Sequence, residues 1–200
     1  MQIRSKENLT MTQNKKDPTT LTLELSNIQT TDLDENTLES PKIMQMFGVQ
    51  NLSPAIAPEV FPTKIEGKLF GRHHHPIANI ITSRAGSSGN PDFNHINVIW
   101  LWDINCPFSM IAKKTFLKLF SDKPQEWLDK VIPGPVGIKI NGRKHLVEIQ
   151  NEADPKIKNS SFCGLNVLGA DFGWNNNILE TIDMSVVKKC FSIELRDPQV

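Results

Sequence analysis

Apolar and polar positions change their pattern along this chain, and the change predicts where the packed part lies. Residues 1 to about 60 are rich in Thr, Asn, Gln, Ser, Lys and Glu, with single, scattered apolar residues. Such a segment buries too little apolar surface to offset the entropy lost on ordering. After Asn94, apolar runs separated by turn residues follow one another in the manner of antiparallel strands. We therefore expect a low-order N-terminal region and linker over 1–94 and a compact domain over 95–197.

One unbroken apolar run, Val98–Trp102, leads directly into a single carboxylate, Asp103, and then into a tight polar turn. A short continuous apolar run bounded by turn residues is typical of a fully buried strand. Asp103 is therefore expected where a buried strand emerges. A carboxylate rarely stands at such a position without a partner or a chemical role.

Two further patterns complete the prediction of a mostly β domain. Val136–Lys144 contains an Asn-Gly pair between two strand-like segments, which is the strongest short-range hairpin signal because both residues accept positive φ. Ser109–Phe120 has helical periodicity with lysines on its outer face. Helices are expected near 109–120 and after Asp171, and strands elsewhere.

The segment Asn97–Ile111 resembles the active-site strand and turn of the retropepsins, the aspartic proteases of retroviruses and LTR retrotransposons. That family carries Asp-Thr/Ser-Gly after its apolar strand, and this chain carries Asp103-Ile104-Asn105. Downstream, Asn166–Phe172 resembles the family's hydrophobic-hydrophobic-Gly element in its retrotransposon form. The segments 181–184 and 191–195 are similar to the closing strands that follow in those enzymes.

This resemblance implies an all-β fold, a single-lobe retropepsin-like acid-protease barrel with one or two short helices after a largely disordered N-terminal region. It implies an aspartic endopeptidase in which Asp103 is the catalytic residue. Aspartic proteolysis needs two carboxylates that share one proton, and this chain supplies one. The expected partners are therefore a second identical chain and a peptide or polyprotein substrate, with no cofactor and no metal.

Ile104 and Asn105 leave an alternative function open. In the family, the hydroxyl group after the catalytic Asp braces the two chains across their axis, and isoleucine has no donor for this bond. The alternative is a catalytically inactive domain of the same fold that acts in binding or assembly. A third class, an adaptor with interaction motifs in its N-terminal half, is based on the compositional division alone.

The remaining candidate residues each have a plainer interpretation. Val167, Leu168 and Gly169 are expected in the core beneath the active-site loop, and Asp171 is expected to make structural polar contacts. The stretch Trp127–Pro135 occupies the place of the family's flap, or is an ordinary surface loop.

Two features suggest other chemistry, and composition limits the class further. His73–His75 is interpreted as a solvated tract, because no Cys, Asp or Glu stands at ligand spacing. Cys106 is interpreted as the small residue after the Asp triplet rather than a nucleophile. Lys+Arg 22 against Asp+Glu 22 gives no net charge, so neither nucleic acid nor membrane is expected as a partner. With no signal-peptide pattern at Met1, a cytoplasmic location is expected, either for this chain or for a longer precursor.

Overall fold

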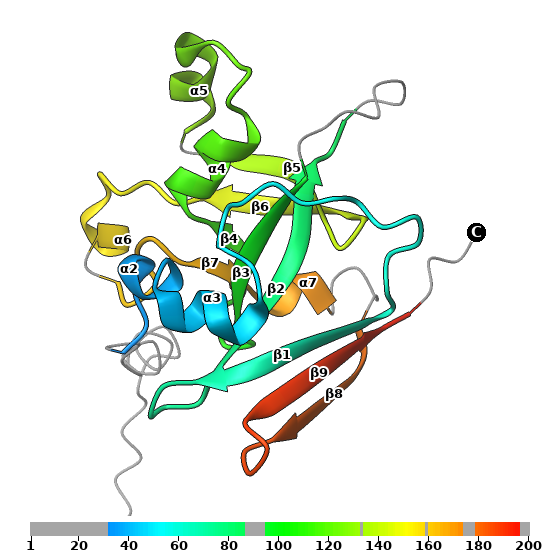
Figure 1. Ribbon diagram of the computed structural model, residues 1–200. Coiled ribbons are helices and arrows are strands. Elements are labelled where there is room, and N and C mark those ends of the chain that lie inside the picture. Colours follow the sequence, from blue (N-terminus) through cyan, green and yellow to red (C-terminus); the bar gives the residue numbers. More distant parts are fainter. Residues whose placement is uncertain (1–31, 87–94, 133, 159, 174–178, 197–200) are drawn as a thin grey trace, which may run out of the picture.

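A computed structural model of the chain describes residues 32–86, 95–132, 134–158, 160–173 and 179–196 (Figure 1). Their strands form one sheet in the order β3-β7-β4-β6-β5-β2-β1-β9-β8, and a further pairing of β3 with β2 closes the first six into a barrel. The strands are β1 (Lys64–Phe70), β2 (His75–Arg84), β3 (Ile96–Trp102), β4 (Met110–Ile111), β5 (Pro135–Ile140), β6 (Arg143–Ile149), β7 (Asn166–Leu168), β8 (Leu179–Ser185) and β9 (Cys190–Leu195). The helices are α2 (Glu35–Leu38), α3 (Pro41–Phe47), α4 (Lys113–Leu119), α5 (Gln125–Val131), α6 (Pro155–Lys158) and α7 (Ala170–Gly173). The predicted mostly β barrel with few short helices is confirmed.

Strand β3 lies at the centre of the molecule and is buried on both faces. Side chains alternate between the two faces of a strand. Trp100 and Trp102 therefore contribute to the cluster inside the barrel, whereas Ile99 and Leu101 contribute to a second cluster on the outer face. This burial on both sides is the physical reason for the unbroken apolar run in the sequence.

Helices α2 and α3 cover that outer face (Figure 1). Asp34 begins α2 by accepting a hydrogen bond of 2.7 Å from the Thr37 N–H. Ser40 and Pro41 begin α3, and Gly48 ends it in the left-handed conformation. We call the apolar residues between these helices and the barrel the outer cluster; its buried members are Leu33, Leu38, Ile43, Phe70, Ile77, Ile99, Leu101, Leu165 and Val167.

The domain boundary predicted at residue 95 is corrected by this arrangement. Strands β1 and β2 and helices α2 and α3 all precede it, and β2 pairs antiparallel with β3 from Ile77↔Leu101 to Thr82↔Ile96. The packed unit thus takes in residues 32–86, which polar composition alone had assigned to a low-order region. The rest of that predicted region, residues 1–31 and 87–94, lies outside the described residues.

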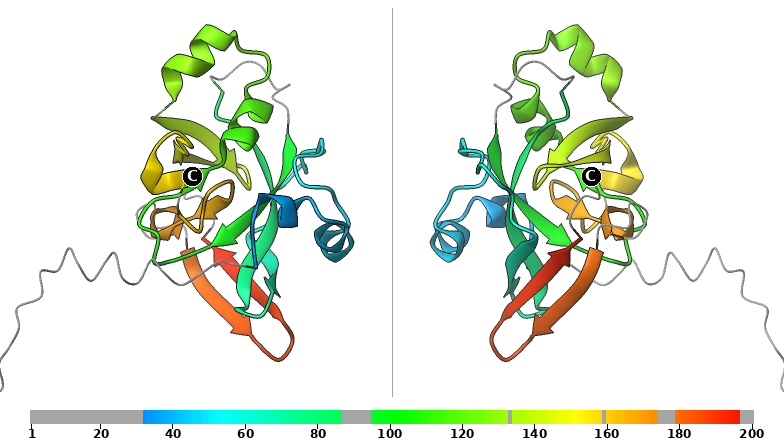
Figure 2. Two further views of the ribbon diagram at one scale, coloured as in Figure 1. Left: turned by 90° about the vertical axis from the view of Figure 1, so that its left-hand side faces the viewer. Right: turned by 90° about the vertical axis from the view of Figure 1, so that its right-hand side faces the viewer.

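Most of the elements predicted downstream are in place. Asn141 and Gly142 have positive φ and join β5 to β6, as the Asn-Gly pair predicted. Strands β8 and β9 form the expected closing hairpin, which extends from the barrel beside β1 (Figure 2). The helix predicted at 109–120 begins later, at Lys113, because Met110 and Ile111 pair with β6 and β7 as strand β4.

Neither interpretation of Trp127–Pro135, the family's flap or an ordinary surface loop, fits the start of this stretch, because Trp127–Val131 belong to helix α5. Trp127 stacks on Phe120 with ring centroids 5.5 Å apart. Arg84, at the end of β2, forms an ion pair with Asp122 just before α5. This end of β2 lies beside the start of β3, so α5 is at the opposite end of the strand from Asp103. In the described part of the chain, no helix is both long and apolar enough to span a membrane.

Candidate active site around Asp103

Asp103 lies at the end of β3, half-buried at the rim of the barrel. Its N–H donates a 3.0 Å hydrogen bond to the Leu168 carbonyl, which continues the parallel pairing of β3 with β7. Its carboxylate Oδ1 accepts a 2.9 Å hydrogen bond from the Asn105 N–H, and its carbonyl accepts one from Cys106. The sequence prediction that Asp103 ends an interior strand beside Leu168 is confirmed.

The loop after Asp103 is held by the chain that follows β7. The Ala170 N–H donates a 2.8 Å hydrogen bond to the Cys106 carbonyl. A Cβ atom on Gly169 would lie 2.6 Å from the Phe108 carbonyl carbon and 2.7 Å from the Cys106 oxygen. Only glycine permits this close crossing of two backbones. Gly169 therefore determines how near Asp103 and its loop lie to β7.

A buried polar network of Ser109, His145 and Asp171 lies next to this crossing. Ser109 Oγ donates a 2.6 Å hydrogen bond to Asp171 Oδ1 and accepts one of 3.1 Å from the Gly169 N–H. His145 Nε2 lies 3.1 Å from Ser109 Oγ and 3.5 Å from Asp171 Oδ2. The network connects β6, the residue just before β4 and helix α7. It also fixes the crossing, because Ser109 Oγ accepts the hydrogen bond from the Gly169 N–H.

These three residue types form nucleophilic triads elsewhere, but the geometry here does not. In such a triad the His uses one nitrogen for the Ser and the other for the Asp. Here the same nitrogen, His145 Nε2, faces both groups, and Ser109 is completely buried. Burial lowers the pKa of His145 below 6.5, although the Asp171 carboxylate opposes this shift. The three side chains therefore stabilise the fold, and Asp171 makes the structural polar contacts expected of it.

Sequence reasoning did not identify Ser109 or His145 as members of a site. His145 had a detectable signal, because the alternation of β6 places it on the same buried face as Val147 and Ile149. A histidine at an inward position of a strand needs a polar partner. Ser109 had no comparable signal, because a serine before a helical segment is usually a cap.

Ile104 and Asn105, the two residues that follow Asp103, lie on the exposed side of the loop. Ile104 is 45 % exposed and Phe108 is 58 % exposed. Asn105 is not among the described residues with positive φ, so this turn does not require glycine. Ile104 thus places an apolar side chain, which has no hydrogen-bond donor, on the surface of the loop.

Cys106 is not prepared to act as a nucleophile. Burial raises the pKa of its thiol to about 11, and the nearby carboxylates of Asp103 and Asp171 act in the same direction. Its Sγ donates to the Phe108 carbonyl at 3.0 Å. Since the thiolate is the reactive form, this cysteine has a packing role.

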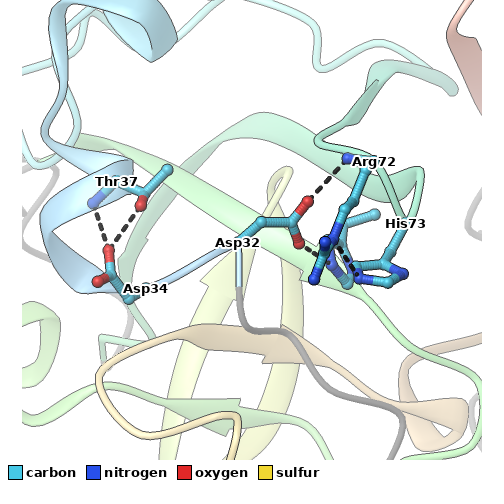
Figure 3. A network of polar contacts seen from close by, with 6 residues as sticks. Asp32, Asp34, Thr37, Arg72 and His73 are labelled. Carbon is cyan, nitrogen blue, oxygen red and sulfur yellow. Dashed lines mark hydrogen bonds and ion pairs between the residues drawn. The ribbon is translucent and has the colours of Figure 1, made fainter.

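The interpretation of His73–His75 as a solvated tract needs correction at one residue. His75 is buried, and its Nε2 lies 2.8 Å from Oδ1 of Asp32. The other oxygen of Asp32 accepts a 2.7 Å hydrogen bond from the Arg72 N–H (Figure 3). Among the residues that the structure describes, no group of three or more His, Cys, Asp or Glu side chains is arranged to hold a metal ion.

Comparison of this chain with protein-family models, with curated proteins and with solved structures gave no match. The site therefore stands on its own geometry. It consists of one half-buried carboxylate on a surface loop, with a glycine crossing and a buried network that hold the loop in place.

Proposed function

We propose that this chain is a retropepsin-like aspartic endopeptidase that hydrolyses peptide bonds with a dyad made of Asp103 from two identical chains. The observation that carries the proposal is the position of Asp103, which ends a buried strand and is tied to Leu168 immediately before Gly169. Both sequence segments that resemble the family thus meet in space at the candidate carboxylate. The loop of Asp103 has exposed residues that a second chain can contact.

The mechanism follows from the shared proton of the dyad. Two carboxylates held close together cannot both ionise, so one retains a proton at mildly acid pH. The ionised Asp103 accepts a proton from a water molecule as it attacks the peptide carbonyl. The protonated Asp103 of the second chain donates its proton to the carbonyl oxygen, which gives a tetrahedral diol. The C–N bond then breaks as the first Asp103 passes its proton to the amine nitrogen and the second takes back a hydroxyl proton. This chemistry needs no metal and no cofactor.

Ile104 favours a second candidate, an inactive domain of the same fold that acts in binding or assembly. An exposed isoleucine cannot donate the hydrogen bond that braces the two chains across their axis. Loss of such a bond costs on the order of 1–3 kcal/mol and weakens the dimer. On this alternative the fold and loop persist while the cleavage step is lost.

The test is hydrolysis of fluorogenic peptides with apolar side chains, measured from about pH 4 to pH 7 with and without pepstatin A. We expect cleavage with an acid optimum that is lost in Asp103→Asn and retained in the matched control Asp183→Asn, whose carboxyl group is exposed on β8. Equal cleavage by wild type and Asp103→Asn would refute the proposal. No cleavage by wild type, but cleavage by Ile104→Thr, would establish the second candidate.

A further inference from the structure

The face of the barrel that carries Asp103 is the face that α2 and α3 cover. Side chains alternate along β3, and the hydrogen bond from Asp103 to Leu168 continues its pairing with β7. Ile99, Leu101 and Asp103 therefore lie on one face. Ile99 and Leu101 belong to the outer cluster. An apolar surface thus leads directly up to the candidate carboxylate.

The outer cluster also includes the immediate surroundings of the Asp103 loop. Val167 of β7 is one of its buried members, and Cys106 and Met110 pack against its edge. These residues come from the loop that follows Asp103, from β4 and from β7, the strand to which the Asp103 N–H donates its hydrogen bond. A peptide whose scissile bond lay at Asp103 would have to place its neighbouring side chains on this same surface, because a bound substrate extends on either side of the bond that is cut.

The surface is occupied by apolar side chains of residues 32–47. Leu33, Leu38 and Ile43 are each 3 % exposed or less and fill it. The outer faces of the two helices are polar or half-exposed. The segment therefore resembles a bound amphipathic peptide, with branched aliphatic side chains toward the barrel and mostly polar side chains toward solvent.

At its edges the segment is held mainly by polar contacts rather than by sheet hydrogen bonds. Lys114 of α4 forms ion pairs with Glu35 and Glu39, and the side chains involved are 39–52 % exposed. Exposed ion pairs of this kind contribute little to stability, because water screens the charges. The stronger polar contact is Asp32 with His75 and the Arg72 N–H (Figure 3). Release of the segment would leave all the barrel strands paired.

We propose that residues 32–47 occupy the substrate-binding surface of this domain, as a built-in competitor that apolar peptides must displace to reach Asp103. This inference rests on the proposed function and extends it to a substrate class. The preferred peptides carry leucine or isoleucine next to the scissile bond, because Leu38 and Ile43 are the side chains that the surface accepts. The free surface is reached only when α2 and α3 leave it.

The test uses the full chain with the recognition sequence of a site-specific protease inserted between Gly48 and Val49. Gly48 ends α3 and is exposed, with nothing within 4 Å of a Cβ at its position, so the insertion is tolerated. A tethered competitor acts at an effective concentration on the order of mM, so cutting the tether in a micromolar solution should raise peptide hydrolysis by about tenfold or more. The matched control is the same protein left uncut. Size-exclusion chromatography then measures whether pepstatin A separates the N-terminal fragment from the barrel.

Release of the fragment by pepstatin A together with faster hydrolysis supports the inference. Release without hydrolysis in any form also supports it, but contradicts the proposed function and indicates a peptide-binding domain. A fragment that stays bound at saturating pepstatin A, with hydrolysis unchanged by cutting, overturns it. As a safeguard against misfolding of the insertion, Glu39→Lys should raise hydrolysis about twofold by weakening the contact with Lys114, and Glu126→Lys on α5 should not.

Discussion

The exposed loop after Asp103 and the buried network of Ser109, His145 and Asp171 lie on opposite sides of the Gly169 crossing and are built in opposite ways. The loop exposes most of its side chains, among them Ile104, Asn105 and Phe108. The network has every one of its three residues at most 9 % exposed. The comparison teaches that the two parts of the site are subject to different physical constraints, because a buried polar side chain needs a partner and an exposed one does not.

The largest expected effect is on the network. Asp171→Ala leaves Ser109 Oγ and His145 without their buried carboxylate, so the free energy of unfolding should fall by about 3 kcal/mol. Urea denaturation followed by tryptophan fluorescence measures this change. Asp171→Asn keeps an acceptor for Ser109 and should lose less than half as much. A loss below 0.5 kcal/mol in Asp171→Ala is the level expected of surface substitutions, and it would contradict a stabilising role of the buried network.

The second-largest loss of stability is expected from a change at Gly169, where the loop crosses the chain that follows β7. Gly169→Ala forces a Cβ against the backbone of the loop, which should cost about 1–3 kcal/mol and speed hydrogen exchange at the Ala170 N–H. Gly137→Ala on β5 is the matched control, because its new Cβ would lie 3.5 Å from Ala85 Cβ, an ordinary contact. Equal stability of the two variants would show that the loop is not held by Gly169.

A smaller effect is expected in the pH dependence of the free energy of unfolding, through His145 of the network. Burial lowers the pKa of His145, so the unfolded chain binds a proton at this residue before the folded chain does. The free energy of unfolding should therefore decrease as pH falls below about 6.5, the ordinary histidine value, until the folded pKa is reached. Urea midpoints from pH 7.5 to pH 5 in wild type and His145→Gln measure this contribution. An identical slope in both proteins would contradict it.

The smallest effect on stability is expected in the loop. Ile104→Thr changes an exposed side chain, so the unfolding free energy of the single chain should shift by no more than about 0.5 kcal/mol. On the proposed function, self-association should nevertheless become tighter, because the hydroxyl group supplies a hydrogen-bond donor where the two chains would meet. Sedimentation velocity compares the two, with Val187→Thr at the tip of the β8–β9 hairpin as an exposed control. Equal association of Ile104→Thr and wild type would place the contact elsewhere.

Local sequence signals predicted those parts of the site that depend on the chain's own pattern. The apolar run before Asp103 and the Asn-Gly hairpin each reflect a requirement of a single segment. The contact of Leu168 and Gly169 with the Asp103 strand and loop was predicted instead from the resemblance of both segments to one protein family. These predictions survive because burial and backbone conformation leave a direct trace in residue type.

The two helices that cover the outer face of the barrel, α2 and α3, could not be predicted in the same way. The run Val98–Trp102 showed that β3 is buried on both sides, but not what buries the second side. Helix α2 contributes one apolar residue, Leu38, which stands among polar neighbours. Helix α3 contributes Ile43, Met46 and Phe47, but it is too short for a clear helical period. The capping residues Asp34 and Ser40 with Pro41 were the available signal. Distant contacts such as those of Ser109 depend on the fold as a whole.

The central claim, a site shared by two chains, is tested most directly by the rate of peptide hydrolysis as a function of total protein concentration. If each chain supplies one dyad carboxylate, as proposed, the rate should rise with the square of concentration below the dimer dissociation constant. Asp103→Asn should show no hydrolysis at any concentration. A rate that stays proportional to concentration down to the lowest measurable level would contradict the account.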